Sequence, residues 1–101
     1  MRIEFSRSGG ITGIRLSLTV DTATMPSEEA RELEDCVDRS GFFELPEVLH
    51  SGGADRLQYR LSIERDGISH SVQMDDGTIP EALSPLIKRL EAASRARLAS
   101  P

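Results

Sequence analysis

Residues 20–26 read VDTATMP and residues 74–80 read MDDGTIP, which align without a gap at an offset of 54 positions (20 to 74). The same offset places Phe5 on Tyr59 and Leu33 on Ile87. Repetition at a fixed period indicates copies of one small unit, neither of which can bury its apolar face alone. We therefore expect a single domain over residues 1–101, built from two repeat units at roughly 1–45 and 55–94.

Strands are predicted on both sides of a reversal in each unit. Apolar and polar residues alternate with period two over residues 2–7, 14–20, 57–63 and 68–74, and that alternation is typical of half-buried strands. Gly9-Gly10-Ile11-Thr12-Gly13 joins the first pair, and its glycines permit the positive φ of a tight reversal. Asp66-Gly67 is a strong two-residue hairpin signal for the second pair.

A helix is predicted after each second strand. In the first unit Thr24 can cap the helix, Pro26 is tolerated in its first turn and Gly41 occupies the C-terminal cap. In the second unit Thr78 and Glu81 have capping-box spacing, and residues 95–101 are expected to fray. The expected apolar stripes are Ala30, Leu33, Cys36 and Val37 in the first helix, and Leu83, Leu86, Ile87, Leu90 and Ala93 in the second.

The predicted order is β-β-α-β-β-α, an α+β fold. Because every strand is apolar on one side only, we expect a four-stranded antiparallel sheet with both helices on one face and an internal pseudo-twofold axis. The pattern leaves the strand order open, although His70 on an apolar strand face suggests a strand near an edge. The opposite face should be polar and solvated, with Glu4, Ser6, Arg15, Ser17, Thr19, Gln58, Arg60, Ser62, Glu64, Ser69, Ser71 and Gln73.

Composition narrows the class of protein. The net charge is −5 and the sequence pI is about 5.0, which argues against nucleic-acid binding because such domains present a basic face. Cys36 is the only cysteine, so a stabilising disulfide within the chain is excluded. The first residues lack the apolar core of a signal peptide, and no stretch is long enough to span a bilayer. We expect a cytoplasmic protein of bacterial type.

Catalytic and metal-binding arrangements are absent from the sequence pattern. His50 and His70 have no further ligands at the spacing of a zinc site, and Cys36 on an apolar helical stripe is typical of a small buried residue. Asp75 and Asp76 precede a helix, where short acidic residues form turns. The glycines of residues 9–13 lead into a strand, whereas a phosphate-binding loop leads into a helix. We expect neither an enzyme nor a bound cofactor or metal.

Four features in order along the chain resemble the emfourin family. They are Gly9-Gly10-x-x-Gly13 after a short strand, Ser40-Gly41-Phe42-Phe43-x-Leu45-Pro46 after the first helix, Asp55-x-x-x-Tyr59 at the second hairpin, and Pro80 before a leucine-rich helix. The resemblance covers roughly residues 1–92. It implies a bacterial protein inhibitor of protealysin-like zinc metalloproteases of the thermolysin family. The alternative is a small protein–protein interaction module without catalytic activity.

An inhibitor without reactive groups of its own must fill its target's cleft, and an apolar anchor on a rigid loop does so at the lowest ordering cost. Ile11, Met25, Leu49 and Ile79 are loop residues of this kind, although Met25 and Ile79 could equally pack against the helix ends. Met25 is our first choice, because Asp21 and Thr24 in the same turn offer polar contacts to a cleft rim. We expect a monomer, while exposed strand edges leave a dimer open.

Overall fold

The structure is a computed structural model that describes residues 1–9, 15–49 and 56–99. Its element order confirms the predicted β-β-α-β-β-α arrangement of an α+β fold. The principal elements are β1 (Arg2–Gly9), β2 (Leu16–Asp21), α1 (Ser27–Ser40), β3 (Leu57–Arg65), β4 (Ile68–Asp75) and α2 (Ser84–Ala99), with short 3₁₀ helices η1 (Thr22–Thr24) and η2 (Phe42–Glu44).

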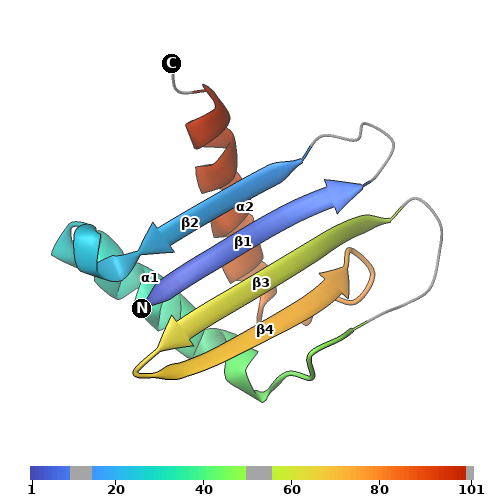
Figure 1. Ribbon diagram of the computed structural model, residues 1–101, viewed down its shortest axis with the longest axis horizontal. Helices are drawn as coiled ribbons and strands as arrows, with labels where there is room; N and C mark the ends of the chain where they lie inside the picture. The colour runs from blue at the N-terminus through green and yellow to red at the C-terminus, as the bar shows by residue number, and fades with distance from the viewer. Residues whose placement is uncertain (10–14, 50–55, 100–101) are drawn as a thin grey trace.

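The four strands form one antiparallel sheet in the order β2-β1-β3-β4. Both helices lie behind this sheet in Figure 1, so one face is covered and the other is open. Each hairpin therefore supplies one central and one outer strand, and β1 and β3 meet in the middle. This is the predicted two-layer packing, and it also supplies the strand order that the sequence left open.

A pseudo-twofold relation holds between β1 and β3, but the two hairpins differ in register. Ser6 pairs with Arg60, its equivalent at the offset of 54 (6 to 60), so this pair lies on the pseudo-axis. In the first hairpin Val20 pairs with Ile3, whereas the equivalent Met74 pairs with Tyr59, the equivalent of Phe5. The turn sets hairpin register, and the second hairpin closes through only Asp66 and Gly67, with φ of 52° and 79°.

The core lies between the sheet and the two helices. Most of the apolar residues that alternate along the strands are buried, as the period-two pattern predicts, and Ile68 is an exposed exception. Phe42 of η2 is fully buried behind Gly41, whose φ of 68° confirms the predicted left-handed C-cap of α1. The buried apolar set is Ile3, Phe5, Leu16, Leu18, Leu33, Val37, Phe42, Tyr59, Leu61, Ile63, Val72, Met74, Leu83, Leu86, Ile87 and Leu90.

The predicted start of the second helix is wrong. The α2 helix begins at Ser84, and a turn precedes it in which the N–H of Leu83 donates to the carbonyl of Pro80. Thr78 does not cap this helix, because its hydroxyl accepts from the N–H of Asp75 and donates toward the carbonyl of Leu49. A threonine hydroxyl readily bonds to nearby backbone groups. Here the bond to Asp75 at the end of β4 takes the place of the capping bond.

Other predicted details of the helices are also corrected. Thr24 does not cap α1, because its hydroxyl donates to the carbonyl of Asp21 and Pro26 occupies the cap position. Ala93 is exposed, and Ser94 is buried in its place with its hydroxyl on the carbonyl of Leu90. The α2 helix continues to Ala99, and the fraying expected for residues 95–101 stays a prediction.

The expectation for His70 is confirmed, because β4 is an outer strand of the sheet. The ring of His70 lies edge-to-face against Phe42, and its Nε2 atom is 2.7 Å from the carbonyl oxygen of Leu45. Beyond it, residues 47–49 add a short parallel bridge to β4 between Val48 and Gln73. One outer strand is thus partly covered by the chain that leaves α1. Cys36 is half-buried and packs against the core, as expected for a small apolar residue.

Candidate functional site

The structure places the predicted contact residues at opposite ends of the sheet. Asp21, Thr24 and Met25 follow β2, next to the start of β1, because Asp21 pairs with Arg2. Leu49 and Ile79 lie at the other end, where β1 ends and β3 begins. Ile11 lies outside the described residues. A single target cleft would therefore meet one group or the other as its main contact.

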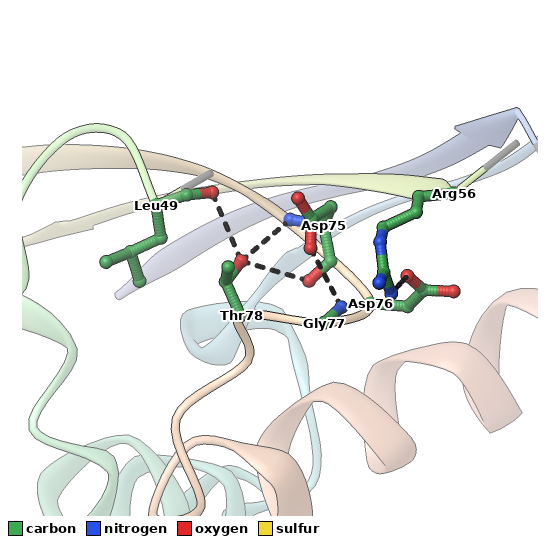
Figure 2. Close-up of polar contacts among 6 residues, drawn as sticks. All are labelled: Leu49, Arg56, Asp75, Asp76, Gly77 and Thr78. Carbon is green, nitrogen blue, oxygen red and sulfur yellow. Dashed lines mark hydrogen bonds and ion pairs between the residues drawn. The ribbon is translucent and has the colours of Figure 1, made fainter. Parts of the chain in front are cut away.

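The turn of residues 75–78, here called the Asp75 turn, closes the end of β4 and is held by side-chain and backbone hydrogen bonds within the turn (Figure 2). The Oδ1 atom of Asp75 accepts from the N–H of Gly77 at 2.8 Å, and the N–H of Thr78 donates to the carbonyl of Asp75 at 3.1 Å. Asp75 is 1% exposed. The prediction that Asp75 belongs to a structural turn is confirmed by these bonds.

Contacts to other segments fix the Asp75 turn in place. The hydroxyl of Thr78 reaches the carbonyl of Leu49 at 3.1 Å, and the N–H of Asp76 donates to the carbonyl of Leu57 at 3.1 Å. Arg56 adds an ion pair with Asp76 at 3.2 Å, drawn beside the turn in Figure 2. The Asp75 turn is thereby held to Leu49 and to residues 56–57, which gives this end of the sheet a defined shape.

The turn of residues 21–25, here called the Asp21 turn, is held by a separate network. Asp21 caps η1 by accepting from the N–H of Ala23 at 2.9 Å, and the hydroxyl of Thr24 donates to the carbonyl of Asp21 at 3.0 Å. The buried hydroxyl of Thr22 accepts from the amine of Met1 at 3.0 Å and lies 3.3 Å from Glu34 Oε2. The turn is therefore tied both to the start of β1 and to α1.

The candidate side chains differ in exposure. Asp21 and Thr24 are exposed, so both can contact another molecule. Met25, Leu49 and Ile79 are half-buried and pack against the core. Packing of this kind is the alternative that the sequence left open for Met25 and Ile79, and only part of each side chain is available to a partner.

Two strongly exposed apolar residues were missed by the sequence analysis. Val48 is 60% exposed and Ile68 is 63% exposed. The alternating pattern assigned Ile68 to the inward side of β4, but the residue lies at the hairpin tip, directly after Gly67. Val48 follows Pro46 in a stretch that was interpreted as loop. A periodic pattern does not encode whether a residue lies at a hairpin tip, as Ile68 does, or on the outer edge of a sheet, as Val48 does.

The open face of the sheet carries several shallow hollows around one side chain. Arg60 lines four of them, the largest with a volume of about 390 Å³. Its cross-strand neighbours are Ser6 and Gln73. Short serine and threonine side chains occupy much of the remaining face, so the surface is flat and polar and suits contact with another macromolecule better than enclosure of a small one.

Two polar contacts between the sheet and the helices shift pKa values. The hydrogen bond from Arg65 lowers the pKa of Asp38 on α1. Burial, followed by the nearby charge of Glu91, raises the pKa of Tyr59. The hydroxyl of Tyr59 donates to Glu91 at 3.3 Å, and Arg7 forms an ion pair with the same carboxylate. Both contacts join the sheet to a helix.

Within residues 1–9, 15–49 and 56–99, no three His, Cys, Asp or Glu side chains form a group that could hold a metal ion. None of the helices in the same ranges is long and apolar enough to cross a membrane. The described part of the chain is thus a small α+β protein whose distinctive surfaces are two ordered turns and an open polar sheet face.

Comparison with known proteins supplies the family. The Emfourin family model matches residues 5–91, and the chain belongs to this family. Emfourins are known as protease inhibitors, so membership supports an inhibitor role in general. The resemblance identified from the sequence is confirmed. Neither the search of curated proteins nor the search of solved structures gives a match.

Proposed function

We propose that this protein is a reversible inhibitor of a protealysin-like zinc metalloprotease of the thermolysin family, in the bacterial cytoplasm. The observation that carries the proposal is the emfourin match over residues 5–91, which spans most of the 101-residue chain. The target class comes from the resemblance to emfourins. The protein acts by occupying the cleft of the enzyme, without a catalytic group or cofactor of its own.

The Asp21 turn is the proposed inhibitory element. Its backbone is fixed by η1, by the bond from Thr24 to Asp21 and by the Thr22 network, so little ordering is needed on binding. Met25 supplies the apolar anchor from the part of its side chain that is not packed on the core. Asp21 and Thr24 are exposed beside it and contact the polar rim of the cleft.

The other end of the sheet is the second candidate for the contact. Leu49 and Ile79 lie beside the rigid Asp75 turn, and Ile11 belongs to the connection after β1. Leu49 and Ile79 are half-buried, as is Met25, so their exposure class does not rank the two ends. Inhibition measured for variants at Met25 and at the residues of this second group distinguishes the two ends of the sheet.

The test is a titration of purified protein against a protealysin-like protease with a peptide substrate. We expect stoichiometric loss of activity that is recovered on dilution. A catalytically unrelated serine protease serves as the control and should be unaffected. Unchanged metalloprotease activity at equimolar micromolar concentrations would contradict the proposal and favour an interaction module with a different partner.

A further inference from the structure

Arg60 occupies the centre of the open sheet face. It lies in a cross-strand row that runs Ser17, Ser6, Arg60 and Gln73 from β2 to β4. The neighbouring row contains Thr19, Glu4, Ser62 and Ser71. Most of these side chains are short, so the long arginine side chain stands among shallow hollows that reach it from four directions.

The guanidinium of Arg60 has no hydrogen-bond or ion-pair partner among the residues that the structure describes. Nearby carboxylates are engaged elsewhere. Glu4 forms an ion pair with Arg2 at 3.3 Å, and Glu64 accepts from Ser69 at 3.4 Å. The chain has 17 acidic residues and a net charge of −5, and yet this exposed arginine forms no ion pair with a carboxylate of the described residues.

The open face also differs in charge from the rest of the protein. Its exposed strand positions carry two arginines, Arg2 and Arg60, and three carboxylates, Glu4, Asp21 and Glu64, so their net charge is −1 and most of the acidic excess lies elsewhere. Much of that excess is on α1, behind the sheet (Figure 1), where Glu28, Glu29, Glu32, Glu34, Asp35 and Asp38 lie. An acidic partner would therefore meet less repulsion at the open face than at α1, and Arg60 is the central cation there.

We propose that the open sheet face is a second contact surface for the inhibited protease, with Arg60 binding an aspartate or glutamate on the enzyme surface. A guanidinium matches a carboxylate through two parallel hydrogen bonds, and arginine is enriched among residues that dominate interface energies. The serine and threonine side chains around it allow a partner carboxylate to approach closely. This inference rests on the proposed inhibition.

One interface can include both Arg60 and the Asp21 turn. Asp21 is four residues from Ser17, which lies in the row of Arg60, so the separation is roughly 13 Å along the strands and about 10 Å across them. A standard interface covers about 800 Å² per partner, or roughly 28 Å across. An enzyme whose cleft receives the Asp21 turn would thus overlie Arg60 as well.

The experiment compares inhibition constants of three variants against a protealysin-like protease at two ionic strengths. R60Q should weaken inhibition about tenfold and R60E more strongly, because a desolvated charge loses its partner or meets a like charge. Higher salt should reduce the difference between R60E and the unmodified protein. The control R31E reverses an exposed charge on α1, behind the sheet, and should change inhibition less than twofold.

Each outcome decides a separate point. Full potency of R60E, with unfolding midpoints equal for all variants, would overturn this inference and leave the inhibitory function intact. Absence of inhibition by the unmodified protein would contradict both the Arg60 contact and the proposed inhibitory function. A concentration-dependent dimer in sedimentation, abolished by R60E, would assign the face to a second copy of the chain and so overturn the enzyme contact. Recovery of R60E inhibition by an enzyme variant with a surface carboxylate changed to arginine would confirm the pairing.

Discussion

The hydroxyl of Thr78 lies 3.1 Å from the carbonyl oxygen of Leu49 and joins the end of β4 to the segment that leads away from α1. The same hydroxyl accepts from the N–H of Asp75 at 3.0 Å. One side chain thus links the Asp75 turn to a neighbouring segment of the chain.

Replacement of Thr78 by valine should destabilise the protein by about 1–3 kcal/mol. The change keeps the shape of the side chain but removes the acceptor for Asp75 N–H and the donor to Leu49, and half-buried polar groups that lose partners cost this much. Urea unfolding monitored by circular dichroism measures the effect. Thr24→Val, at an exposed hydroxyl with one local bond, should cost no more than roughly 0.5 kcal/mol. Equal losses for the two variants would mean that the contacts of Thr78 with Asp75 and Leu49 together contribute no more than the single exposed bond of Thr24.

Met25→Ala should weaken inhibition of the protease by more than tenfold, equivalent to about 1.4 kcal/mol of binding free energy. The reason is the loss of the proposed apolar anchor from the Asp21 turn. Inhibition constants measured beside Ile79→Ala provide the comparison, because Ile79 occupies the equivalent position in the repeat and is equally half-buried. If Ile79→Ala weakens inhibition and Met25→Ala does not, the contact lies at the other end of the sheet.

Tyr59 should titrate above the ordinary tyrosine pKa of about 10. Burial and the charge of Glu91 raise its pKa in the folded protein, so folding favours the protonated phenol. This contribution to stability is complete below the unfolded-state pKa and is lost as pH rises through the folded-state pKa. Tyr59 is the only tyrosine and the chain has no tryptophan, so tyrosinate absorbance reports on this residue alone. A folded-state midpoint at or below that of a denatured sample would contradict the expectation.

Arg65→Gln should raise the pKa of Asp38 toward its ordinary value. The hydrogen bond from Arg65 is the main reason that this pKa is lowered. A lowered folded-state pKa stabilises the fold above the unfolded-state value, and this stabilisation disappears as pH falls through the folded-state pKa. Side-chain carboxyl chemical shifts followed by NMR across the acidic range measure the change. Arg39→Gln, near the end of the same helix, is the matched control and should leave the Asp38 titration in place.

Gly9→Ala should destabilise the protein more than Gly41→Ala. Both glycines have positive φ, 89° and 68°, so alanine is strained at either position by roughly 1–2 kcal/mol. A Cβ atom at Gly9 would in addition lie 3.0 Å from the carbonyl oxygen of Arg56, whereas the space at Gly41 is open. Thermal unfolding of the two variants should therefore give the lower midpoint for Gly9→Ala, and the reverse order would show that the contact with Arg56 relaxes at no cost.

The sequence predicted what depends on periodicity and failed where local hydrogen bonds compete. Alternation identified all four strands and the covered face, and His70 indicated an outer strand correctly. Thr24 and Thr78 have the residue type and spacing of helix caps, but each bonds instead to backbone at a strand end. No pattern in the sequence distinguishes these two uses of a threonine hydroxyl.

The candidate site could be predicted only in part for a related reason. Composition and loop position singled out Met25, Leu49 and Ile79, but their half-burial depends on how far the helical layer extends beneath each turn. Ile68, directly after the turn at the hairpin tip, is exposed although it continues the apolar alternation of β4. The division of the candidates between two ends of the sheet follows from the strand order, which the pattern left open.

The meeting of β1 and β3 at the pseudo-axis has a consequence for fragments of the chain. Of the three strand interfaces in the sheet, only β1–β3 lies between the two repeat units, so a fragment ending at residue 49 would expose the whole inner edge of β1. Such a fragment should recruit either a complementary fragment carrying β3 and β4 or another copy of itself. The two units are thus arranged like the two subunits of a small dimer, joined covalently in one chain.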